Sequence, residues 1–258
     1  MEAQPNPVQV GTAILKARRT KRPMPTGTGT LAHSELADVL ESLKQDGIAT
    51  LPDSRDALLG YRDRLAALDP RKLTRLEALA FWINLYNAGA LALAADAVDT
   101  SAGSVLRVPG AFNEPWATVN GESLTLNDIE HGKIRRFGDP RIHAALVCGS
   151  VSCPTLRYEP FGGDVEAQLD EQIRGFLGSG GAAIDRTSGV LRLSRVFRWY
   201  GRDFVVPHRM PTILPARRRS LANALIPWFA PTDAAWVRTT MPTIEFAEYD
   251  WSLACSIA

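Results

Sequence analysis

One segment of the sequence holds the residues best suited to chemistry. An apolar run over residues 141–147 ends at Cys148, and Gly149, Ser150 and further small, turn-forming residues follow it. This pattern predicts a buried strand that delivers a thiol to a loop at its end, and loops of this kind often carry functional sites. Cys148 is therefore a candidate nucleophile.

A nucleophilic cysteine needs a partner that favours its thiolate, together with donors for the oxyanion that forms on attack. His131 lies on a short polar helix ahead of the cysteine segment, and we expect it to act as the base. The backbone N–H groups of Gly149 and Ser150 are expected to form the oxyanion hole. His143 falls on the opposite face of the predicted strand from Cys148 and is interpreted as a satisfied core histidine.

A third group could orient the His131 imidazole, as in a papain-like triad. Asn84 and Asn87 are three residues apart on an apolar helix and share one face. Buried amides must be hydrogen-bonded, so these two either lock neighbouring loops or point at a site. Glu130 is the other candidate, although adjacent helical residues point about 100° apart, which makes it the least favourable orienter by geometry.

The same residues allow other chemistry. The spacing of Cys148 and Cys153 permits a loop disulfide or a redox pair, although it is not the CxxC spacing of thioredoxin-like proteins. A zinc ion held by His131, Cys148 and Cys153 would lack the closely paired ligands typical of such sites. The sequence has no P-loop, GxGxxG or GxSxG motif, and we expect neither a metal nor a cofactor.

Composition excludes several classes of partner. The chain has 258 residues, 45% of them hydrophobic, and 29 Lys and Arg against 28 Asp and Glu leave a net charge of +1. A global charge this small does not predict binding to nucleic acid, and no apolar run is long enough to predict a membrane span. Three cysteines are too few for a disulfide scaffold. The protein is expected to be soluble, either cytoplasmic or exported with its signal already removed, and the oligomeric state is left open.

The pattern of elements predicts a single α+β domain over residues 34–258, preceded by an extended or disordered arm over residues 1–33. Residues 74–98 are expected to form the central buried helix. Helices are expected to pack on one mixed or antiparallel sheet. Its strands are predicted at residues 116–119, 122–125, 141–148, 182–185, 190–193 and 244–253, and a further short strand is predicted at residues 105–108. One shared aromatic core is expected from Trp82, Tyr86, Phe197, Trp199 and Trp251.

Several motifs occur together in a recognisable order. They are AFWINLYNA at residues 80–88, LNDIEHGKIRR at 126–136, DPRIHAALVCGSVSCP at 139–154, RVFRWYGRDF at 195–204 and YDWSL at 249–253. This ordered set resembles the domain-of-unknown-function family numbered 547 over residues 35–255. Members of that family occur in bacterial proteins, often exported ones, and in plant and animal proteins beside other modules, with no settled activity.

The resemblance makes particular positions characteristic, namely those of Glu130, His131, Cys148 and Gly149. The position of Cys153 can be serine in plant-type members, which favours Cys148 as the reactive thiol. The chain departs from the family at Ala254, where the family usually has Asn.

The expected function is that of a thiol-dependent hydrolase or acyltransferase acting on an amide or ester, with a peptide or acyl compound as substrate. Two alternatives stay open. One is a redox or disulfide protein using Cys148 and Cys153. The other is a non-enzymatic interaction module, which the six Trp, nine Phe and five Tyr would suit.

Overall fold

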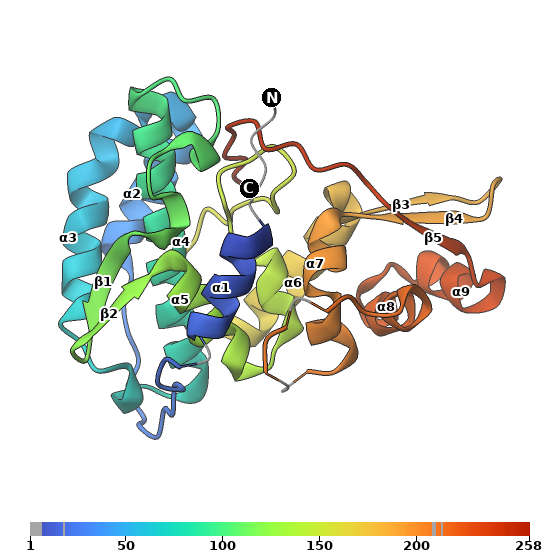
Figure 1. The fold of residues 1–258 in the computed structure, drawn as a ribbon, viewed down its shortest axis with the longest axis horizontal. Helices are drawn as coiled ribbons and strands as arrows, with labels where there is room; N and C mark the ends of the chain where they lie inside the picture. The colour runs from blue at the N-terminus through green and yellow to red at the C-terminus, as the bar shows by residue number, and fades with distance from the viewer. Residues whose placement is uncertain (1–6, 18, 208–209, 213) are drawn as a thin grey trace.

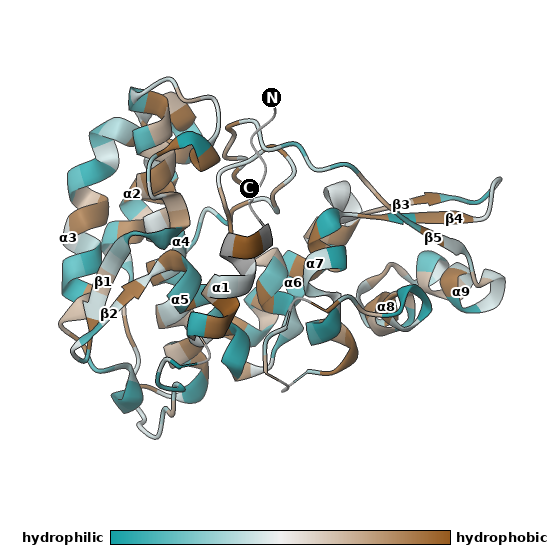
Figure 2. Ribbon diagram, in the orientation of Figure 1, coloured by the Kyte–Doolittle hydropathy of each residue, from teal (hydrophilic) through white to brown (hydrophobic). Residues whose placement is uncertain are grey.

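The computed structural model describes residues 7–17, 19–207, 210–212 and 214–258. Helices dominate the fold, and Figure 1 shows α2 and α3 beside α4 at one end of the molecule and α8 and α9 beside the three-stranded sheet at the other. The helices are α1 Pro7–Ala17, α2 Ser34–Asp46, α3 Arg55–Ala66, α4 Arg75–Asp99, α5 Leu126–Gly132, α6 Val165–Phe176, α7 Arg195–Val205, α8 Arg218–Leu225 and α9 Pro231–Thr240. In Figure 2, hydrophobic and hydrophilic residues mix along the outer helices α2 and α3.

Helix α4 forms the centre of the larger hydrophobic core. Its N-cap is Thr74, whose hydroxyl accepts a hydrogen bond from the backbone N–H of Glu77, so the expected start is confirmed. Length and composition alone would allow this helix to cross a membrane. However, the apolar window that meets this criterion is completely buried inside the protein, as in the core helix of a globular fold.

Within the described ranges the strands form two small sheets, and the fold class is α+β. Strands β1 (Pro115–Val119) and β2 (Glu122–Thr125) make an antiparallel hairpin, whose turn residues Asn120 and Gly121 both have positive φ, as the Asn-Gly pair predicts. The second sheet has the order β3-β4-β5, with an antiparallel β3–β4 pair and a parallel β4–β5 pair. Its strands are β3 Ala182–Asp185, β4 Val190–Leu193 and β5 Thr243–Phe246.

Three strand predictions need correction. The segment before Cys148 is not a strand, because residues Pro140–Ala144 form a 3-10 helix, η6, that begins at an Asp139 cap and a proline. Residues Val105–Arg107 form another 3-10 helix, η3. The last strand ends at Phe246, and the chain beyond it runs back from the three-stranded sheet toward the helical half of the molecule (Figure 1). The expected single sheet is therefore replaced by two.

The expectation of an extended N-terminal arm is wrong for Pro7–Ala17, which form α1, while residues 1–6 and 18 lie outside the described part of the chain. Helix α1 is stable here because Ala13, Ile14 and Ala17 are buried where α1 packs on α5. Lys16 also pairs with Asp128 of α5 at 3.2 Å. The prolines and the basic run suggested an arm, but tertiary packing overrides that local signal.

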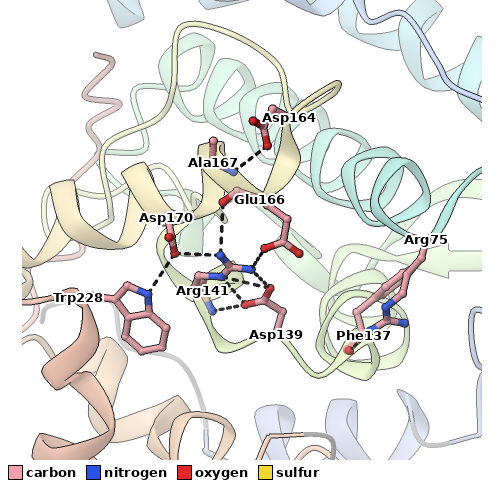
Figure 3. A network of polar contacts seen from close by, with 9 residues as sticks. All are labelled: Arg75, Phe137, Asp139, Arg141, Asp164, Glu166, Ala167, Asp170 and Trp228. Carbon is pink, nitrogen blue, oxygen red and sulfur yellow. Dashed lines mark hydrogen bonds and ion pairs between the residues drawn. The ribbon is translucent and has the colours of Figure 1, made fainter.

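A network of charges fixes η6 against α6 (Figure 3). The Arg141 guanidinium binds Asp139 at 2.6 Å, contacts Glu166 and binds Asp170 at 2.9 Å. The indole N–H of Trp228 donates to the same Asp170 carboxylate at 3.2 Å. Since Arg141 precedes Cys148 by one short turn and a loop, this network limits how the cysteine segment can move.

The expected shared aromatic core is wrong. Trp82 and Tyr86 lie in the large core around α4, whereas Phe197 lies in a second core between the three-stranded sheet and helices α6–α9. Trp199 and Trp251 are only partly buried, and their rings lie 5.8 Å apart in a separate group with Tyr249. The prediction treated all large aromatics as equivalent, but the chain divides them between two cores and a partly exposed cluster.

Candidate active site

Asn87 of α4 clamps the backbone immediately before Cys148. Its amide N–H donates to the carbonyl of Ala145 at 3.0 Å, and its oxygen accepts from the N–H of Val147 at 3.1 Å. Asn84 makes the same pair of bonds with both backbone groups of Phe161. Both amides therefore bond to backbone groups of neighbouring loops, and among the described residues no hydrogen bond joins either of them to His131. They lock neighbouring loops, which is the other outcome that buried amides allow.

The C-terminal segment holds the cysteine loop from the other side. The N–H of Val151 donates to Ser252 O at 3.0 Å, the N–H of Ser152 donates to Asp250 O at 3.3 Å, and the N–H of Ala254 donates to Gly149 O at 3.2 Å. Ala254 therefore contributes only its backbone here. These bonds satisfy the loop without a sheet ladder, and this explains why the segment need not be a strand.

Three polar groups converge on the Cys148 sulfur. Its distances are 3.1 Å to Ser150 Oγ, 3.2 Å to the Tyr249 hydroxyl and 3.1 Å to Cys153 Sγ, and the two hydroxyl oxygens are 2.9 Å apart. The hydrogen bond from Cys153, together with those from Ser150 and Tyr249, lowers the pKa of the Cys148 thiol against the opposing effect of burial. Donors to the charged form favour it, so this arrangement stabilises a thiolate.

Tyr249 contacts the Cys148 sulfur, and reasoning from the sequence did not identify it as a candidate site residue. It lies far along the chain, at the start of the YDWSL motif, and the motif itself was the only signal that could have pointed to it. Burial raises the pKa of its hydroxyl well above the ordinary range, so Tyr249 stays protonated and able to donate. Its ring also packs on Trp199 and Trp251, with centroids 4.9 and 4.5 Å away.

Gly149 has the conformation that a site of this kind requires. Its φ is +71°, and a Cβ at this position would lie 3.0 Å from Val105 Cγ1, so a side chain is disfavoured on two grounds. Within the described part of the chain, the N–H groups of Gly149 and Ser150 donate no hydrogen bond. Both residues are buried, and their N–H groups have no acceptor among the described residues, which is the state that the expected oxyanion hole needs.

His131 is a buried residue of helix α5. Its Nδ1 is 3.3 Å from Arg135 Nη1, and since arginine can only donate, the imidazole accepts at this atom and carries its proton on Nε2. Burial, aided by the charge of Arg135, lowers the pKa of His131 to about 4, so the ring is neutral at pH 7. Among the described residues, no hydrogen bond joins His131 to Cys148.

Glu130 is the carboxylate nearest to the imidazole, although it was expected to be the least favourable orienter. One of its oxygens is 3.3 Å from His131 Nδ1 without hydrogen-bond alignment, and it has no hydrogen-bond partner among the described residues. The other accepts from the Tyr86 hydroxyl at 3.3 Å. Burial would raise the pKa of Glu130, but attraction to His131 and Arg135 outweighs burial and lowers it.

His143 is a satisfied core histidine, as interpreted from the sequence. Its Nε2 lies 2.9 Å from Asp203, and its ring stacks on Tyr200 with centroids 4.1 Å apart. Arg135 binds the same carboxylate at 2.7 and 3.1 Å, which helps to hold the pKa of Asp203 below its ordinary value despite burial. In the chain as described, no three His, Cys, Asp or Glu side chains are grouped to hold a metal ion.

Replacing Tyr249 with Phe should slow alkylation of Cys148 at pH 7 by about tenfold or more, because a hydrogen bond to a charged group contributes about 1.5–3 kcal/mol. The measurement is the rate of iodoacetamide labelling of Cys148 against pH, followed by mass spectrometry. The labelling rates of the variant and the wild type should converge at high pH, where Cys148 is ionised in both proteins. Tyr158→Phe, at an exposed position, is the matched control. Equal rates for all three proteins at every pH would contradict the role given to Tyr249.

The comparison with protein families adds one finding. Residues 70–177 match the family described as "Protein of unknown function, DUF547". This part of the chain belongs to the DUF547 family. No curated protein and no solved structure matches the chain. The DUF547 segment includes Asn87, Glu130, His131 and Cys148, and it ends before Tyr249.

Proposed function

We propose that this DUF547 protein is a thiol-dependent hydrolase or acyltransferase that acts on an amide or ester, with Cys148 as its nucleophile. The observation that carries the proposal is the convergence of Ser150, Tyr249 and Cys153 on the Cys148 sulfur. A buried thiol kept only for packing needs no such set of donors. A thiolate does, because its charge must be stabilised away from bulk water.

The reaction would follow the usual course of covalent acyl transfer. The Cys148 thiolate forms a bond to the carbonyl carbon, and the N–H groups of Gly149 and Ser150 bind the resulting oxyanion. The intermediate then breaks its carbon–oxygen or carbon–nitrogen bond, and the leaving group departs with a proton from water. Attack on the thioester by water gives a carboxylic acid, and attack by an acceptor gives the transferred acyl product. Either route restores Cys148.

In this proposal the hydroxyl groups of Ser150 and Tyr249, and not the His131 imidazole, stabilise the Cys148 thiolate. His131 accepts from Arg135 at Nδ1, and among the described residues no hydrogen bond joins it to the sulfur, so we do not assign it the removal of the Cys148 proton. With Glu130 it belongs to the buried polar network behind the site. A small effect of His131→Gln on acyl transfer, beside a large effect of Tyr249→Phe, is the result that separates this arrangement from a direct cysteine–histidine dyad.

The test uses p-nitrophenyl acetate, an activated ester, with mass spectrometry of the quenched protein. We expect a burst of nitrophenol, an acetyl group on Cys148 and continued turnover. Cys148→Ser should lower the rate on the order of 10³-fold or more, the scale for losing a catalytic nucleophile, and leave thermal unfolding unchanged. Cys255→Ser is the matched control.

Acetylation spread over surface lysines, or turnover unaffected by Cys148→Ser, would overturn the proposal. That result would favour the interaction module over an enzyme.

A further inference from the structure

The two cysteines of the site loop already lie in contact. Their sulfurs are 3.1 Å apart, and the backbone N–H of Cys148 donates to Cys153 Sγ at 2.9 Å. Both are free thiols in the structure. A disulfide requires a separation of about 2.0 Å, so the sulfurs need to move by only about 1 Å.

The surrounding backbone holds the pair together. A turn joins the two residues, because the N–H of Cys153 donates to Ser150 O at 3.1 Å. Asn87 fixes the chain ahead of Cys148, and the C-terminal segment pairs with Val151 and Ser152 within the loop. The contact between the sulfurs is therefore supported by backbone hydrogen bonds on both sides of the loop.

The two thiols are not equivalent. The donors around Cys148 lower the pKa of its thiol, whereas burial raises the pKa of Cys153. One sulfur is thus prepared to attack as a thiolate and the other to follow as a thiol. This asymmetry is typical of a reactive cysteine beside a resolving cysteine.

The loop that carries this pair lies at the protein surface. Both cysteine residues are partly exposed, and Val151, between them in the loop, is 51% exposed. The third cysteine is placed differently. Burial raises the pKa of Cys255 to about 12, and it makes no hydrogen bond to either sulfur within the described residues.

We propose that Cys148 and Cys153 form a dithiol that hydrogen peroxide oxidises to a disulfide, with Cys148 as the attacking sulfur and Cys153 as the resolving one. The Cys148 thiolate attacks one peroxide oxygen and breaks the oxygen–oxygen bond, which leaves a sulfenic acid on Cys148 and releases hydroxide. The thiol of Cys153 then attacks that sulfur, and the sulfenic hydroxyl leaves as water with the thiol proton. Overall, hydrogen peroxide is reduced to hydroxide and water, and the two thiols are oxidised to a disulfide.

The disulfide removes the nucleophile, so oxidation switches off any acyl transfer at Cys148. This inference shares the Cys148 thiolate with the proposed function but not its acyl chemistry. The two ideas can therefore fail separately, and the ester assay on the fully reduced protein distinguishes them.

The test treats the reduced protein with hydrogen peroxide, blocks remaining thiols with N-ethylmaleimide and maps the products by mass spectrometry. Wild type should lose two hydrogens and retain one blocked thiol, at Cys255. Cys153→Ser should stop at a sulfenic acid on Cys148 that dimedone traps, and Cys148→Ser should react at least about tenfold more slowly. Cys255→Ser should form the disulfide at the wild-type rate.

Several results would overturn the inference. These are a wild-type protein that keeps all its thiols under peroxide, a disulfide that includes Cys255, or the same products from Cys153→Ser as from wild type. If the disulfide forms while the reduced protein shows no ester turnover, the redox inference stands and the acyl-transfer proposal fails.

Discussion

Replacing Trp82 with Ala should lower the free energy of unfolding by about 3–5 kcal/mol, the range for truncating a large buried aromatic. Trp82 lies on α4 with 3% of its surface exposed, and its ring packs edge-on against Phe81 at 5.0 Å. Lys133 Nζ lies 5.6 Å from the ring centroid and adds a cation–π contact. Urea denaturation monitored by circular dichroism gives the measurement.

Trp82→Phe is the matched control for this prediction. Among the described residues the Trp82 indole N–H has no hydrogen-bond partner, so Phe removes a buried unsatisfied donor while keeping most of the apolar surface. The Phe variant should therefore lose clearly less stability than the Ala variant. Similar losses for the two variants would show that the apolar contacts of the ring do not account for its contribution.

Acidification from about pH 6.5 to about pH 4 should remove on the order of 3 kcal/mol of stability through His131, and a similar amount through His33. Burial is the main cause that lowers the pKa of each to about 4, with help from Arg135 for His131 and from Arg64 for His33. Unfolding returns both to about 6.5, so the unfolded state binds more protons within this window. Stability is fully present above pH 6.5 and is lost as the pH falls toward 4.

The slope of unfolding free energy against pH tests this linkage directly. Wild type should take up close to two protons from these histidines on unfolding near the middle of the window, and His131→Gln and His33→Gln should each take up about one fewer. The slope is informative even if a variant is less stable at every pH. Unchanged slopes in both variants would mean that other groups produce the acid sensitivity.

The candidate site was predicted in part. The apolar run ending in Cys148 and Gly149 marked the thiol that three polar groups surround, because a thiol and a glycine at the end of a buried segment are visible in the sequence alone. The residue that contacts this thiol from the C-terminal segment could not be predicted in the same way. Tyr249 reaches Cys148 from a distance of about a hundred residues along the chain, and nothing in local spacing indicates such a contact.

The prediction for Glu130 rests on helix geometry. Adjacent helical side chains point about 100° apart, which argued against Glu130 as the residue that orients His131. One Glu130 oxygen lies 3.3 Å from His131 Nδ1, but without the alignment of a hydrogen bond. At Nδ1 the imidazole accepts from Arg135 instead.

The sequence by itself determined the elements whose signals are local. Thr74 and the apolar residues after it specify α4, and the Asn120–Gly121 pair specifies the first hairpin, because capping and positive-φ turns depend on neighbouring residues. Only the tertiary structure decided the state of the segment before Cys148. Its backbone groups could be satisfied by a sheet or by Asn87 and the C-terminal segment, and the choice depends on which distant partner packs there. The environment of the thiol follows from that choice, since Ser150, Cys153 and Tyr249 converge only when the loop is held in this way.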